Sequence, residues 1–145
     1  MAAQKGDVGI IAVDGSSNAE EATEWYLSHL HRPTTKLFLI HCIEYPSMPS
    51  RDTWEAQTRA GRQKAEDLAK KYQEKLEKHN VTNAEFIQEF ENPGESIVSS
   101  AHKFEADFIV MGTRGQGKLR RTLMGSVSDY VVNHSPVPII VCRHK

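Results

Sequence analysis

The sequence predicts an α/β domain built on an open, largely parallel five-stranded sheet with helices on both faces. Short apolar runs alternate with longer amphipathic segments in the order β-α-β-α-β-α-β-α-β. Most of these runs are continuously apolar, which is typical of parallel strands buried on both faces. The chain has 145 residues, of which 39% are hydrophobic and 26% charged, so residues 1–145 fit a single domain with one core.

In the first half of the chain, turn chemistry separates two apolar runs from two helical patterns. Gly15-Ser-Ser-Asn18 closes the first run, and Asn18 is a candidate cap for the helix that follows. Pro33 stops that helix, whereas Gly61 weakens the beginning of the second one. The expected elements are strands at residues 8–14 and 37–43 and helices at residues 19–31 and 53–78.

The second half begins with the run that alternates best, residues 84–90, so we expect a partly exposed strand nearer an edge of the sheet. Asn92-Pro-Gly94 is predicted to be a turn, and Ser135-Pro136 ends the last helix. Apolar positions at helical spacing predict a short helix around residues 97–104 and a last helix around residues 127–131. The remaining strands are expected at residues 107–111 and 137–142.

Composition narrows the range of partners. The formal net charge is -1, which favours no polyanion, so we expect no nucleic-acid partner. Cys42 and Cys142 lack metal-ligand spacing and are expected to be reduced thiols, and the seven histidines form no zinc pattern. His41 is expected to pack within its strand. No apolar run has the length of a signal peptide or membrane span, so the expected location is cytoplasmic, without a membrane partner.

A glycine-rich basic segment follows the fourth predicted strand. Residues 112–126, GTRGQGKLRRTLMGS, contain four glycines and four basic residues. The segment begins like a Walker A loop, but Leu119 stands where the metal-binding Ser or Thr is needed. A solvent-exposed connection is the plain alternative. Against it, the segment leaves the carboxyl end of a buried strand and reaches Ser126 at a helix start, where N–H groups bind anions.

Several other residues allow both a structural and a functional interpretation. Ser126 and Asp129 resemble a capping box, so the serine has a structural role available. Asp14 could be a simple turn residue, but its position opposite the glycine-rich segment favours a ligand contact. Trp25 and Trp54 are expected to pack helices onto the sheet, with the mouth of a ligand pocket as an alternative place for Trp54.

The spacing of Gly112, Gly115 and Gly125-Ser126 resembles the G-2x-G-9x-G-[ST] signature of the ATP-binding branch of the universal stress protein family. The resemblance covers nearly the whole chain, including the first strand ending in Val13-Asp14 and the last strand, Val137-Pro-Ile-Ile-Val141. It implies a Rossmann-like fold, similar to the adenine nucleotide alpha hydrolases, with a five-stranded parallel sheet in the order 3-2-1-4-5.

The same resemblance implies how a nucleotide would be held. Asp14 would bind ribose, Cys42 would pack on adenine where the family often has Val, and the glycines would let backbone N–H groups approach the phosphates. Arg114 would either screen phosphate charge or remain solvated. The expected nucleotide-binding residues are Ala12, Val13, Asp14, Cys42, Met111, Gly112, Arg114, Gly115, Gly125, Ser126, Val127 and Ser128.

The function implied by the resemblance is that of an ATP-binding, homodimeric, nucleotide-dependent sensor or regulator in a stress response. AMP or ADP are alternative ligands, and Mg²⁺ or Mn²⁺ would arrive with the phosphates. The dimer would form through strand 137–142, although Pro138 removes one donor from the ladder. The alternatives are a weak ATPase or nucleotidyl-transferring enzyme that uses the same pocket, and an interaction domain without nucleotide.

Overall fold

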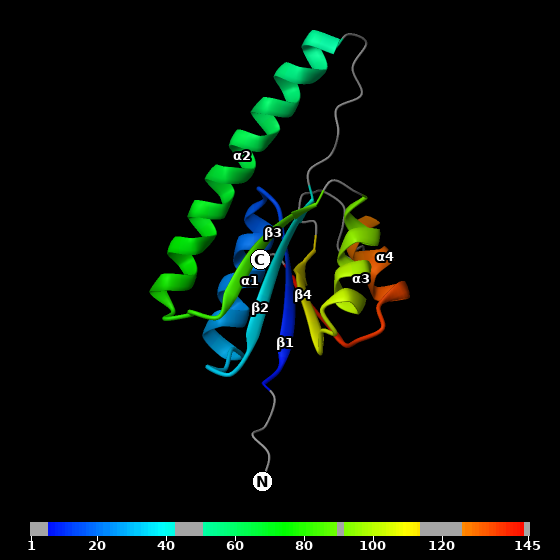
Figure 1. Cartoon of the computed structure of the whole chain (residues 1–145). Coiled ribbons are helices and arrows are strands. Elements are labelled where there is room, and N and C mark those ends of the chain that lie inside the picture. Colours follow the sequence, from blue (N-terminus) through cyan, green and yellow to red (C-terminus); the bar gives the residue numbers. More distant parts are fainter. Residues whose placement is uncertain (1–5, 43–50, 90–91, 114–125, 144–145) are drawn as a thin grey trace.

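The computed structural model describes residues 6–42, 51–89, 92–113 and 126–143. Strands and helices alternate along the whole chain, as the sequence predicts (Figure 1). The elements are β1 Val8–Val13, α1 Ser17–His29, β2 Lys36–Cys42, α2 Arg51–Lys78, β3 Ala84–Glu89, α3 Pro93–Lys103, β4 Phe108–Gly112, α4 Ser126–His134 and β5 Ile139–Cys142.

The five strands form one parallel sheet in the order β3-β2-β1-β4-β5, which confirms the predicted fold class and strand order. Strand β3 is at an edge, as its alternating sequence predicts. The chain moves outward from β1 through β2 to β3, and then returns to β4 on the other side of β1. This reversal between β1 and β4 is the switch point of the sheet, and ligands of open α/β sheets bind beyond the strand ends there.

Two apolar layers fix this sheet in place. Successive residues of a strand point to opposite faces, so Ile11 packs toward α1 and α2 while Ile10 packs toward α3 and α4. Both isoleucines are completely buried, and burial of such a side chain contributes about 1.5–3 kcal/mol. The carboxyl ends of the strands are therefore anchored by a packed core on both faces.

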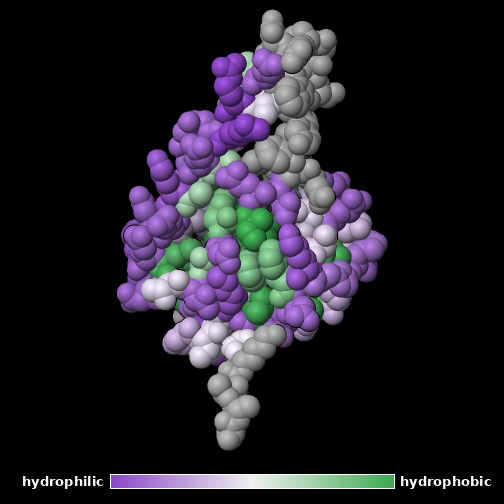
Figure 2. Space-filling model, viewed as in Figure 1, coloured by the Kyte–Doolittle hydropathy of each residue, from purple (hydrophilic) through white to green (hydrophobic). Residues whose placement is uncertain are grey.

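Helix α2 is much longer than the strands that it covers. Its 28 residues span about 42 Å, whereas the 7 residues of β2 span about 23 Å. Its amino-terminal turns extend past the carboxyl ends of the strands, and Figure 2 shows mainly hydrophilic side chains along it. The helix runs through Gly61 without a break. The side chain of Trp54 lies outside the described residues.

Most boundaries lie within a few residues of the sequence-based expectation, and the differences at α1, α3 and β5 each involve a cap or a proline. Helix α1 begins at Ser17 and is capped by Ser16 rather than by Asn18. Asn92 and Pro93 do not form a free turn, because Asn92 caps α3 and Pro93 occupies its first turn. Strand β5 begins at Ile139, after Pro138, whose carbonyl oxygen still accepts a hydrogen bond from the Ile109 amide at 3.0 Å. In each case a residue typical of turns directly precedes or begins the next helix or strand.

Trp25 does not pack α1 onto the sheet, contrary to the prediction. Its side chain is 42% exposed and stacks on His29, with ring centroids 4.9 Å apart. The sheet side of α1 is instead formed by Ala22, Tyr26 and Leu27, which are all buried. Trp25 directly precedes Tyr26 in the sequence, and adjacent residues of a helix do not share a face. Its indole ring therefore lies along the exposed surface of the helix.

Candidate functional site

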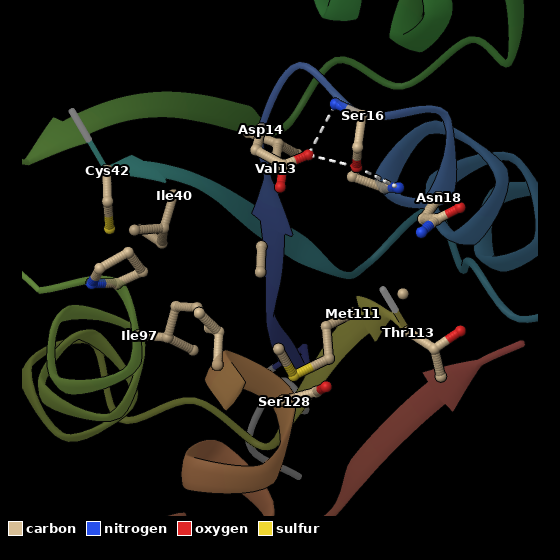
Figure 3. A pocket seen from close by; sticks show the side chains of 15 residues that line it. Val13, Asp14, Ser16, Asn18, Ile40, Cys42, Ile97, Met111, Thr113 and Ser128 are labelled. Atoms are coloured by element: carbon tan, nitrogen blue, oxygen red, sulfur yellow. Dashed lines mark hydrogen bonds between the residues drawn. The ribbon is translucent and has the colours of Figure 1, made fainter. Parts of the chain in front are cut away.

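A cavity of about 620 Å³ lies beyond the carboxyl ends of β1 and β4, at the switch point of the sheet (Figure 3). Small-molecule sites are commonly about 300–1,000 Å³ in volume, so this one can hold a ligand of nucleotide size. Its described lining residues are Ala12, Val13, Asp14, Ser16, Asn18, Ala19, Ile40, Cys42, Pro93, Ile97, Met111, Gly112, Thr113, Val127 and Ser128.

One side of the cavity is apolar. Ala12 and Ile40 are register partners on β1 and β2, and Cys42 follows on the same face of the sheet two residues along β2. Ile97 of α3 and Val127 of α4 approach them from the helix layer. These side chains give an apolar lining between sheet and helices, which suits a flat apolar group.

The other side carries one carboxylate whose orientation is fixed. The Oδ1 atom of Asp14 accepts a hydrogen bond from the backbone N–H of Ser16 at 2.8 Å and a second one from the Ser16 hydroxyl. The Ser16 hydroxyl oxygen in turn accepts from the Ala19 amide at 3.2 Å. Figure 3 shows Asp14 and Ser16 together at the end of β1, on the rim of the cavity.

Three helices begin at this cavity. The first turns of α1, α3 and α4 contribute lining residues, among them Asn18, Pro93 and Ser128. The N-terminus of a helix carries a partial positive charge and unpaired N–H groups, which attract anions. The caps Ser16 and Asn92 already accept from first-turn amides of α1 and α3, so what the three ends share is the partial positive charge, which favours a ligand with an anionic part.

Gly112 allows the start of α1 to lie against the end of β4. A Cβ atom at this position would be 2.6 Å from the backbone oxygen of Asn18, closer than any real Cβ contact. The sequence-based interpretation assigned Gly112 to phosphate approach, but the described neighbour that requires glycine is α1. One residue later, the Thr113 amide donates to the Cys142 carbonyl at 3.0 Å, so β4 stays paired with β5 up to the cavity.

His41 lies next to the site but on the opposite face of the sheet. It is the register partner of Val13, its ring is 6.1 Å from that of Phe86, and its Nδ1 atom is buried without a hydrogen-bond partner in the described structure. Burial lowers the pKa of His41, and the charge of Asp14 opposes this shift only in part. The ring is therefore neutral at pH 7 and packs in its strand, as predicted.

The structure brings most of the predicted site residues together around the cavity. Those that line it are Ala12, Val13, Asp14, Cys42, Met111, Gly112, Val127 and Ser128. Ser126, the first residue of α4, is exposed and does not line the cavity. Arg114, Gly115 and Gly125 lie outside the described residues. Their roles in ligand binding remain predictions.

Sequence reasoning missed seven lining residues. Ile40 comes to the site through strand register, and Ile97 through the packing of α3 on the sheet, so no local pattern marks either one. The Asn92-Pro93 pair is a helix-start signal that could have placed Pro93 at a helix start. The missed residues are Ser16, Asn18, Ala19, Ile40, Pro93, Ile97 and Thr113.

Within the ranges that the structure describes, no group of three or more His, Cys, Asp or Glu side chains could hold a metal ion. No helix in those ranges is both long and apolar enough to cross a bilayer.

Comparison with known proteins decides the family. The model of the universal stress protein family matches residues 10–143. The chain belongs to the universal stress protein family. A family member from Staphylococcus haemolyticus is 35% identical over 136 residues, covering 92% of this chain and 82% of its own length. A relative from Staphylococcus aureus is 34% identical with the same coverage.

Solved structures of the family share the fold at lower sequence identity. The protein UspA from Lactobacillus plantarum superposes with a TM-score of 0.80 at 21% identity, covering 97% of this chain and 100% of that one. A family protein from Arabidopsis thaliana with AMP bound gives a TM-score of 0.74 at 20% identity, covering 96% and 92% of the two chains. A universal stress protein in complex with cAMP gives 0.73 at 18% identity, covering 95% and 97%.

Proposed function

We propose that this chain binds ATP in the cavity between β1 and β4 and acts as a nucleotide-dependent sensor or regulator in a stress response. The observation that carries the proposal is the division of the cavity into two halves. One part is lined by apolar side chains of the sheet, α3 and α4, and the other carries the Asp14 carboxylate next to the start of α1. An adenine nucleotide likewise joins a flat base, through ribose, to anionic phosphates, so its base suits the apolar part of the cavity and its ribose the polar part.

Each part of an adenine nucleotide has a matching surface. The base fits between Ala12, Ile40 and Cys42 on the sheet and Ile97 on α3. The Asp14 carboxylate is an acceptor for ribose hydroxyl groups at the rim. The phosphates would lie near the start of α4, where the helix dipole favours negative charge. Family proteins with bound AMP and with bound cAMP support an adenine ligand.

Phosphate number and metal are further parts of the proposal. AMP and ADP present the same base and ribose, so they are the alternatives to ATP. Mg²⁺ or Mn²⁺ would enter with the phosphates, since such ions are commonly held by substrate phosphates with few protein ligands. The part of the sequence that would distinguish these ligands, residues 114–125, lies outside the described residues. The predicted cytoplasmic location and the absence of a nucleic-acid partner also remain predictions.

The test is direct analysis of the ligand. Mass spectrometry of small molecules released from freshly purified protein should detect ATP, and titration calorimetry of nucleotide-free protein should give saturable binding. Asp14→Ala should weaken ATP, ADP and AMP alike, whereas Ser126→Ala should weaken ATP more than AMP. Glu66→Ala, a carboxylate change on the exposed surface of α2, is the control. No released nucleotide together with no binding at millimolar ATP would contradict the proposal.

An enzyme in the same pocket is the rival function. Among the described lining residues, Asp14 is the only carboxylate and no histidine is present, so a group that would position an attacking water is not evident there. Binding without rapid turnover is therefore the function that we propose. Robust ATP hydrolysis would replace it with the enzyme alternative.

We also propose a homodimer through β5. This strand is at the edge of the sheet, and all four of its residues are only partly buried although all are apolar or weakly polar. An apolar edge strand readily pairs with another strand. Pairing of two β5 strands about a two-fold axis would cover both edges at once.

A further inference from the structure

Ser16 makes more hydrogen bonds than a helix cap requires. Its hydroxyl oxygen accepts from the Ala19 amide at 3.2 Å, which is the usual bond of an N-cap residue. The same hydroxyl donates its proton to Oδ1 of Asp14, and the Ser16 backbone N–H donates to that oxygen as well. A hydroxyl group has only one hydrogen to donate, and in Ser16 that hydrogen points to Asp14.

This network determines how Asp14 faces the cavity. Asp14 is exposed and lies just after β1, where an isolated aspartate would change rotamer freely. Two donors on Oδ1 hold the carboxylate in one orientation, and no described group donates to Oδ2. Figure 3 shows both bonds to Ser16 running to the same carboxylate oxygen. An acceptor that is fixed before binding loses less freedom when a ligand arrives.

We propose that Ser16 is a positioning residue of the ligand site. It orients Asp14 so that Oδ2 accepts hydrogen bonds from the vicinal hydroxyl groups of a bound ribose. Ser16 thereby determines the preference of the site for ribonucleotides over nucleotides that lack these hydroxyl groups. This inference rests on the proposed binding of an adenine nucleotide, and assigns the ribose preference to a residue that itself lines the cavity.

The capping role and the positioning role can be separated by substitution. Gly at an N-cap position costs a helix only a little, so Ser16→Gly keeps α1 while it removes the hydroxyl donor to Asp14. Ser16→Thr keeps both the donor and the acceptor and should restore the wild-type behaviour. Ser17→Ala changes an exposed neighbouring hydroxyl that does not line the cavity, and is the matched control.

The experiment compares ATP with 2′,3′-dideoxy-ATP by titration calorimetry. Ser16→Gly should weaken ATP by about tenfold, the scale of one hydrogen bond to a charged group, and should change the dideoxy nucleotide by less than about twofold. In an Asp14→Ala background the same substitution should have no further effect on ATP. Thermal unfolding of the ligand-free variants should confirm that all are folded.

Two different failures can be distinguished. If wild-type protein binds neither nucleotide, the proposed function is wrong and the role of Ser16 falls with it. If the wild type binds ATP, then unchanged affinity in Ser16→Gly, or an equal loss for both nucleotides, overturns the positioning role alone. Failure of Ser16→Thr to restore ATP affinity would also overturn it.

Discussion

At the scale of single residues, two glycines beside the cavity have opposite structural roles. A Cβ atom at Gly15 would meet nothing within 4 Å, whereas one at Gly112 would be 2.6 Å from the backbone oxygen of Asn18. No glycine among the described residues has a positive φ, so neither position needs glycine for its backbone conformation. The two positions therefore differ only in the space that is available for a Cβ atom.

The prediction is a contrast between Gly112→Ala and Gly15→Ala. Gly112→Ala should lower the free energy of unfolding by about 1–3 kcal/mol, because backbone must move to admit the methyl group. Gly15→Ala should leave it unchanged or raise it by up to about 1 kcal/mol, because alanine reduces the freedom of the unfolded chain. Urea unfolding of ligand-free protein measures both, and equal losses would show that the packing of α1 on β4 is not what requires Gly112.

Single residues also show how far the sequence can locate a site. Asp14 could be predicted, because a polar residue directly after a buried strand is a local pattern. Ile40 could not, since it reaches the cavity through its pairing with Ala12, a contact between residues far apart in the sequence. Ser16 lies two residues from Asp14, and the role proposed for it rests on the direction of a hydroxyl bond, which the residue types alone do not specify.

At the scale of elements, the order and type of the strands and helices were predictable, and the boundaries were less so. The starts of α1 and α3 were misplaced because capping residues resemble turn residues in a sequence. Asn92 accepts from the amides of Gly94 at 3.1 Å and Glu95 at 3.4 Å, so an Asn-Pro-Gly sequence that reads as a turn begins a helix. These helix starts contribute Asn18, Ala19 and Pro93 to the lining of the cavity, so a boundary error here affects the site.

The edge strand β5 gives a prediction at the same scale. Pro138 and Cys142 accept hydrogen bonds from Ile109 of β4 and from Thr113 just after it. By alternation, the backbone N–H of Val141 therefore points to the open edge. Val141→Pro should remove a donor needed by a second β5 strand and leave the pairing with β4 intact. Wild-type protein should sediment as a dimer at tens of micromolar, and this variant as a monomer. Val141→Ala, which keeps the N–H group, should remain dimeric.

Two results would contradict the pairing of β5 strands. A wild-type protein that sediments as a monomer would exclude the dimer at that concentration. A Val141→Pro variant that stays dimeric would place the interface on another surface. The exposed side chains of Trp25 and Val132 would then be the first positions to test, because both are more than 40% exposed.

At the scale of the whole molecule, sequence patterns that agree with one another specify the fold, whereas the site forms only when distant segments pack together. Continuous apolar runs, helical stripes and one alternating strand all agree on a parallel sheet with an edge at β3. The cavity exists because the order of the strands reverses between β1 and β4 and three helices start at the same end of the sheet. Its volume and shape therefore depend on packing between distant segments, which a single sequence does not specify.

The stability of the whole molecule should depend on pH through two histidines. Burial lowers the pKa of His31, and the charge of His79 lowers it further, while its Nδ1 atom is 3.0 Å from the Tyr26 hydroxyl. Burial likewise lowers the pKa of His41, with Asp14 acting in the opposite direction. Both folded-state pKa values are thus below the ordinary value of 6.5.

The sign of the effect follows from proton binding. As the pH falls below 6.5, the unfolded chain takes up protons at these two positions before the folded chain does. The contribution of the two histidines to the free energy of unfolding is therefore complete above pH 6.5 and decreases as the pH falls. Glu24 adds a second loss at lower pH. Burial raises its pKa, but hydrogen bonds from His79 and Lys75 outweigh this, so the folded pKa is below 4.5 and its contribution disappears as pH falls through that range.

The combined variant His31→Gln, His41→Gln should therefore lose less stability than wild type between pH 6.5 and about pH 5. Below pH 4.5 the two proteins should lose stability in parallel, because Glu24 is unchanged. Urea midpoints measured across this range give the comparison, with His102→Gln as the same substitution at an exposed position. Identical curves for wild type and the combined variant would mean that these partly buried imidazoles accept protons as readily in the folded chain as in the unfolded one.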